Sequence, residues 1–113
     1  ATVYKGLLAP LTEINTPQIH EDAEHVFHQF VIQTPRRDVL QAHLEKNNIS
    51  TRLHYPTPLP MLRAYKYLKL SSASYPYAVK ITQRILSLPI SPELSQTAIH
   101  AIVDSVSSSP SEQ

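Results

Sequence analysis

The residues best placed to do chemistry lie in one short proline-rich segment, HYPTPLP, which runs from His54 to Pro60. Three prolines within five residues fix the backbone φ angle at three points, remove three amide donors and push the preceding residues toward extended geometry. The segment is therefore predicted to be a stiff loop that forms neither a helix nor a central strand. It opens with His54 and Tyr55, whose side chains form hydrogen bonds or stack on a ring, so we expect the loop to present them to a ligand.

Arg52 lies two residues before His54, and the two side chains share one face of a strand predicted over residues 49–55. A guanidinium group fits a carboxylate or a diphosphate with two parallel hydrogen bonds, and an imidazole can bond a sugar hydroxyl or a phosphate. The alternative is that both residues are merely solvated on a polar strand face. The sequence therefore nominates Arg52, His54 and Tyr55 as binding residues and nominates no catalytic residue.

One glycine and no cysteine among 113 residues exclude several kinds of site. Loops that cradle phosphate need glycines for close backbone approach, which Gly6 alone does not supply. The lack of cysteine removes disulfides and thiolate ligands and is compatible with the cytoplasm. His25 and His28 would point to opposite faces of a strand, and His28 is predicted to be buried in the core. No histidine spacing resembles a zinc site, so no metal is expected.

The bulk composition is that of an ordinary small globular unit, with 42% hydrophobic residues and a net charge of +1. Tyrosines alternate with basic residues between positions 63 and 69, a pattern that superficially resembles a stacking platform for single-stranded nucleic acid. The net charge is too low for that reading, so nucleic acid is not an expected partner. No apolar run approaches the length of a membrane span, so no membrane contact is expected.

The first half of the chain predicts a helix, a strand and a second helix. Helical spacing of apolar residues over 1–11 indicates the end of a helix, and a loop follows over 12–24. Apolar residues at both parities over 25–33 predict a strand buried on both faces. Thr34 offers an N-cap and Pro35 a first helical position for a helix that ends at the two asparagines 47 and 48.

The second half predicts a strand over 49–55, a short helix over 61–68 and two longer helices. Pro76 opens a helix whose buried side includes Ile81, Ile85 and Leu88, and residues 87–90 are predicted to be extended. Ser91 caps and Pro92 opens the last helix. This order predicts an α+β fold with a small, mostly antiparallel sheet packed by helices.

The ordered series of segments resembles the carboxy-terminal part of the DegT/DnrJ/StrS family of sugar aminotransferases. The series comprises the strand over 25–32, the helix opening at 37–40, the segment 49–59 that includes His54, and the segment LSLPISPEL over 86–94. Members of this family are pyridoxal phosphate (PLP) enzymes of the aspartate aminotransferase fold type. The resemblance implies a small carboxy-terminal α/β sandwich domain over 24–106. The end of a linking helix and a loop over 1–23 precede it, and a disordered tail over 107–113 follows it.

The resemblance also implies a function for the full-length enzyme, which would move an amino group from glutamate onto a keto sugar linked to a nucleotide. The enzyme would be a cytoplasmic homodimer serving polysaccharide or antibiotic sugar synthesis, and the small domain would contact the nucleotide sugar through Arg52, His54 and Tyr55. The Schiff-base lysine belongs to the amino-terminal domain of the family. This chain begins without a methionine and is expected to be a fragment that is inactive and binds no PLP alone. None of its five lysines matches the family motif: Lys5, Lys46, Lys66, Lys69 and Lys80.

Two alternatives stay open in the sequence. Pro60 stands where many family members have a histidine, so the sugar is left undefined, and a residue in the amino-terminal domain decides between aminotransferase and dehydratase variants. The chain is alternatively a free-standing, non-catalytic binding module of the same fold. A domain from a larger enzyme should expose an apolar patch where the large domain packs, whereas a stand-alone module should not.

Overall fold

The computed structural model describes residues 1–110, and its elements form the α+β fold that the sequence predicts. The helices are α1 (Thr2–Leu8), α2 (Arg37–Lys46), α3 (Pro76–Thr82) and α4 (Gln96–Ser107). The strands are β1 (Phe30–Gln33) and β2 (Ile85–Leu88), and short 3-10 turns form η1 (Leu59–Met61), η2 (Arg63–Leu68) and η3 (Ser72–Ser74). The tail predicted over 107–113 starts inside α4, and residues 111–113 lie outside the described part.

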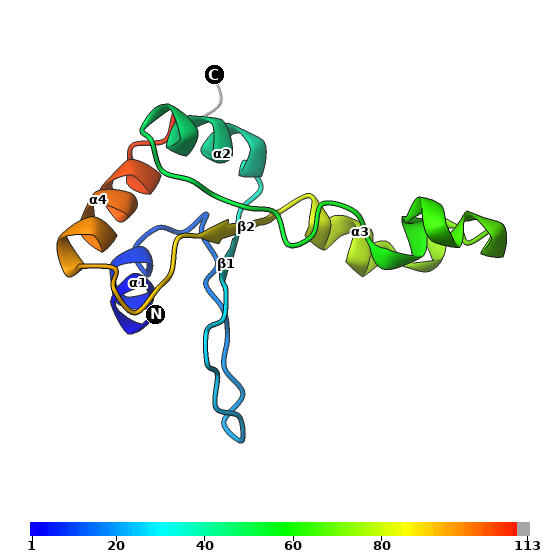
Figure 1. Ribbon diagram of the computed structural model, residues 1–113, viewed down its shortest axis with the longest axis horizontal. Coiled ribbons are helices and arrows are strands. Elements are labelled where there is room, and N and C mark those ends of the chain that lie inside the picture. Colours follow the sequence, from blue (N-terminus) through cyan, green and yellow to red (C-terminus); the bar gives the residue numbers. More distant parts are fainter. Residues whose placement is uncertain (111–113) are drawn as a thin grey trace.

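The sheet consists of β1 and β2, which pair antiparallel with Phe30 opposite Leu88. A single bridge extends the pair on each side, from Asn15 to β1 and from Arg52 to β2. Figure 1 shows α1, α2 and α4 gathered together, whereas α3 lies apart from them. The sheet therefore joins segments that are far apart in the sequence, and one of them carries Arg52.

The core lies between the sheet and three of the helices, and we call α1, β1, α2, β2 and α4 the body. Its buried apolar residues are Tyr4, Leu8, Phe30, Ile32, Leu40, Leu44, Leu86, Leu88, Ile99, Ile102, Val103 and Val106. The ring of Tyr4 stacks on Phe30 with centroids 4.9 Å apart, and its hydroxyl donates to the Pro89 carbonyl at 2.8 Å. Burial raises the pKa of the Tyr4 hydroxyl to about 12.

A long excursion between the two strands, residues 56–82, projects away from the body, and we call it the arm (Figure 1). No residue between 52 and 84 is buried. The radius of gyration is 15.7 Å, against about 13 Å for a compact domain of about 100 residues. The arm leaves Tyr67, Leu68 and Tyr77 exposed by 75%, 49% and 85%. Its apolar side chains thus have no cover within the described part of the chain.

The strand predicted over 25–33 is shorter than expected and is not buried on both faces. Only Phe30–Gln33 pair, buried and partly exposed residues alternate along them, and Val26 is 86% exposed. Phe27 has a left-handed φ of 49°, and its amide donates to the ring of His25 at 2.8 Å, so the extended chain is interrupted there. The burial predicted for His28 is wrong, because that residue is exposed.

Three helix boundaries also differ from the prediction. The Thr34 amide donates to the Arg84 carbonyl at 2.9 Å, which holds Thr34 beside the strands, so α2 begins at Arg37 rather than at Pro35. Ser91 forms only a turn, and α4 begins after Ser95, whose side chain accepts from the Ala98 amide. The short helix predicted over 61–68 consists of 3-10 turns.

The two remaining corrections concern strands. Ile85 and Leu86 belong to β2 instead of extending the helix that begins at Pro76, because pairing with β1 buries all of Ile85–Leu88. The extended backbone predicted from residue 87 onward is confirmed for residues 87 and 88. The strand predicted over 49–55 is reduced to one bridge at Arg52. Asn48 has the left-handed conformation expected after α2, with a φ of 59°.

Candidate functional site

The segment 49–59, which carries Arg52 and His54, meets the segment 86–94 at Ser87. The Arg52 amide donates to the Ser87 carbonyl at 3.2 Å, and the Ser87 amide donates to the Arg52 carbonyl at 2.8 Å. The Ser87 hydroxyl lies 2.9 Å from Nδ1 of His54. Ser87 is only 5% exposed and sits in β2, so a rigid part of the body holds both Arg52 and His54.

A hollow of about 180 Å³ lies over this junction. Its polar lining includes Arg52, His54, Ser87 and Gln29, and residues 88–90 form an apolar wall. No carboxylate lines it. The guanidinium and the imidazole that it offers suit a ligand rich in oxygen acceptors.

The structure brings together two of the three residues nominated from the sequence. Arg52 and His54 both line the hollow, as expected for side chains two residues apart on an extended chain. Arg52 takes part in no ion pair within residues 1–110. Tyr55 lies outside it, 70% exposed, with its ring edge-on to that of His54 at 5.6 Å. Sequence reasoning missed Ser87, although it belongs to the LSLP segment that carried the resemblance.

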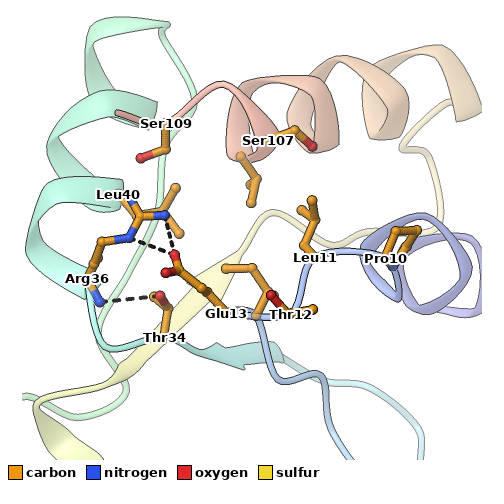
Figure 2. A pocket seen from close by; sticks show the side chains of 11 residues that line it. Pro10, Leu11, Thr12, Glu13, Thr34, Arg36, Leu40, Ser107 and Ser109 are labelled. Atoms are coloured by element: carbon orange, nitrogen blue, oxygen red, sulfur yellow. Dashed lines mark hydrogen bonds and ion pairs between the residues drawn. The ribbon is translucent and has the colours of Figure 1, made fainter. Parts of the chain in front are cut away.

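A second hollow, of about 250 Å³, lies between residues 10–14, α2 and the end of α4 (Figure 2). Arg36 points across it to Glu13, with Nε donating to the carboxylate at 2.8 Å, and also donates to the Pro110 carbonyl. Both charges are therefore satisfied inside the protein, and the pair ties a loop, a helix start and the end of α4 together. This arrangement is structural and offers no free group for chemistry.

Two of the five lysines, Lys66 and Lys69, line a hollow and can be compared with a PLP site. Such a site needs a lysine for the Schiff base and an acid facing the pyridine nitrogen. A hollow on the arm that Lys66 and Lys69 line has no carboxylate in its lining. Moreover, no acidic residue occurs between positions 46 and 92.

Two further features bear on the kinds of site present. Within residues 1–110 no three histidine, aspartate or glutamate side chains come together as ligands for a metal ion. In the same part of the chain, no helix has the length and apolar character needed to cross a membrane.

Comparison with known proteins places this architecture among sugar aminotransferases. In a crystal structure of DesV from Streptomyces venezuelae in complex with a ketimine intermediate, the matching part is 35% identical and has a TM-score of 0.89. The match covers 93% of this chain and 28% of that one. A DegT/DnrJ/EryC1/StrS aminotransferase from Brucella abortus matches with a TM-score of 0.82 at 27% identity, over 92% of this chain and 27% of that one.

The sequence relation is equally direct. The model of the DegT/DnrJ/EryC1/StrS aminotransferase family matches residues 1–107, so this chain belongs to that family. The erythromycin biosynthesis sensory transduction protein EryC1 of Saccharopolyspora erythraea is 37% identical over 100 residues, which are 88% of this chain and 27% of that protein. The dTDP-3-amino-3,4,6-trideoxy-alpha-D-glucose transaminase of Streptomyces venezuelae is 36% identical over 94% of this chain and 28% of its own length. The chain thus spans about a quarter of the length of these relatives.

Proposed function

We propose that this chain is the carboxy-terminal domain of a PLP-dependent aminotransferase that aminates a keto sugar linked to a nucleotide, with glutamate as the amino donor. The observation that carries the proposal is the family match over residues 1–107 combined with coverage of only about a quarter of the relatives. Relatives include a dTDP-amino-sugar transaminase, which supports a nucleotide sugar as the substrate.

In this proposal the PLP and its lysine lie in an amino-terminal domain of the full-length protein. The lack of a carboxylate beside Lys66 and Lys69 supports that division, and the chain alone is then inactive and binds no PLP. The arm supports it as well, because exposed apolar side chains such as Leu68 and Tyr67 are expected where a larger domain packs. A stand-alone binding module gains no comparable support. The full-length enzyme is a cytoplasmic homodimer.

The role of this domain is to hold the nucleotide sugar at its edge. Arg52 and His54 contact oxygen atoms of the substrate from the hollow, and Tyr55, exposed on the outer side of His54, stacks on or donates to the part of the substrate outside the hollow. The PLP supplies the transfer chemistry when bound, and the residues of this chain bind and orient the sugar.

A chimera tests the proposal. This chain would replace the matching segment of the Streptomyces venezuelae transaminase, and amino transfer from glutamate to a dTDP-linked keto sugar would be measured with and without Arg52→Ala. We expect turnover by the chimera, and a higher KM with Arg52→Ala because a charged hydrogen bond contributes about 1.5–3 kcal/mol. A folded, PLP-loaded chimera without activity would contradict the proposal.

The isolated chain gives the complementary result. Mixed with PLP, it is expected to show no stoichiometric Schiff-base absorbance, because its lysines lack the paired acid. Stoichiometric attachment of PLP to one of the five lysines would place the chemistry in this chain and overturn the division of roles.

A further inference from the structure

The hydroxyl of Ser87 has only one side-chain partner among residues 1–110, which is Nδ1 of His54 at 2.9 Å. Ser87 is 5% exposed, so its proton is poorly placed to reach water. A buried donor without an acceptor costs about 1–3 kcal/mol. The hydroxyl therefore donates to Nδ1, and Nδ1 of the neutral ring acts as the acceptor.

This assignment decides what His54 offers to a ligand. A neutral imidazole carries one proton, so when Nδ1 accepts a hydrogen bond, the proton sits on Nε2. Nε2 of His54 has no hydrogen-bond partner among the described residues, and the ring lines the hollow. Nε2–H is thus a free donor in a hollow that Arg52 also lines. The guanidinium of Arg52 is donor-only, and its Nη1 donates to the Thr51 carbonyl at 3.4 Å.

We propose that Ser87 is a positioning residue that locks His54 as the Nε2–H tautomer, so that His54 and Arg52 together form a donor site for a phosphate group. The hollow of about 180 Å³ is smaller than the roughly 300–1,000 Å³ of sites that enclose a drug-sized ligand. It accommodates one charged end of a ligand and leaves the remainder outside. Identifying that end with the diphosphate of a nucleotide sugar rests on the proposed function.

The backbone of Ser87 strengthens the role of its side chain. Its amide and carbonyl pair with Arg52, while its hydroxyl holds His54, so a single buried residue sets the positions of both donors. A site whose polar groups are held in advance loses less conformational entropy on binding. Loss of the hydroxyl should loosen His54 and leave the pairing with Arg52 intact.

The test is made on the 15N-labelled chain. Long-range 1H–15N spectra at alkaline pH, where neutral imidazole dominates, report which ring nitrogen carries the proton, and His54→Gln identifies the signal. We expect His54 to be the Nε2–H tautomer in the unaltered chain and a mixture of tautomers in Ser87→Ala. Ser87→Thr, which keeps the hydroxyl, should restore the tautomer, and Ser72→Ala on the arm should change nothing.

Inorganic pyrophosphate is the probe for the ligand class. The unaltered chain is expected to bind it with chemical-shift changes at His54 and Arg52, and Ser87→Ala should bind it about three- to tenfold more weakly, the value of one hydrogen bond. An Nδ1–H tautomer in the unaltered chain would overturn the proposal even if Ser87→Ala fails to fold. So would an unchanged tautomer and affinity in Ser87→Ala, or no binding of pyrophosphate.

These outcomes are separable from the proposed function. A chimera without transaminase activity, together with an Nε2–H tautomer and pyrophosphate binding, would refute the function and leave the donor site standing. An active chimera in which His54 carries its proton on Nδ1 would refute the role of Ser87 and leave the proposed function standing.

Discussion

Two leucines, one in a helix of the body and one in a 3-10 turn of the arm, show how these two regions differ. Leu44 in α2 is completely buried, whereas Leu68 at the end of η2 is 49% exposed. The body covers its apolar side chains with its own helices and sheet, and the arm does not. Burial of apolar area is the main term that offsets conformational entropy. The body therefore carries its own stability, while the arm contributes little buried apolar area.

Charged residues are also distributed unequally between the arm and the rest of the chain. All nine acidic residues lie outside the arm, while four of the ten basic residues lie in it: Arg63, Lys66, Lys69 and Lys80. The net charge of +1 thus conceals a basic arm and an acidic remainder. An exposed surface that combines basic and apolar side chains is suited to contact with another protein surface.

The largest effect that separates the two regions should come from a matched pair of leucine substitutions. Leu44→Ala is expected to lower the free energy of unfolding by about 2–5 kcal/mol, because it leaves a cavity in the core. Leu68→Ala should change it by less than about 0.5 kcal/mol. Urea unfolding of both variants measures the difference, and equal losses would mean that the arm is packed as tightly as the body.

A pH dependence at Tyr4 should sharpen the comparison. The pKa of its hydroxyl is raised from 10.0 to about 12 in the folded body, so between these values the folded state binds more protons than the unfolded state. Stability is full below pH 10 and falls as the pH rises toward about 12, by about 2–3 kcal/mol for a shift of this size.

The measurement for Tyr4 is urea unfolding across this alkaline range. Tyr4→Phe should remove the fall, whereas Tyr77→Phe, at the 85% exposed arm position, should leave it in place. An unchanged pH profile in Tyr4→Phe would show that other groups cause the fall.

The smallest expected difference concerns two serine caps of similar geometry. Ser95 accepts from the Ala98 amide at 3.1 Å at the start of α4, and Ser71 accepts from the Ala73 amide at 3.2 Å on the arm. Ser95→Ala should cost about 1 kcal/mol of unfolding free energy, while Ser71→Ala should cost almost nothing, since η3 buries no residue. A comparable loss in Ser71→Ala would show that the arm unfolds together with the body.

Local sequence patterns predicted much of this protein. The prolines of the HYPTPLP segment excluded an α-helix and a strand, as found, because they fix φ and remove donors, although Leu59 and Pro60 enter the 3-10 turn η1. Asn48 was expected to end α2 and does so with a left-handed backbone. The spacing of two residues between Arg52 and His54 on an extended chain was enough to predict that both side chains line one hollow. The α+β class follows from the order of such segments.

Only the tertiary structure decided the rest. Ile85 and Leu88 fit a helical stripe as well as they fit a strand, and pairing with β1, distant in the sequence, selected the strand. The same pairing brought Ser87 to His54, a contact that no local pattern contains. Side-chain spacing reports local geometry, whereas strand pairing and burial depend on which distant segments meet. The proposed binding residues Arg52 and His54 were therefore visible in the sequence, and their contact with Ser87 was not.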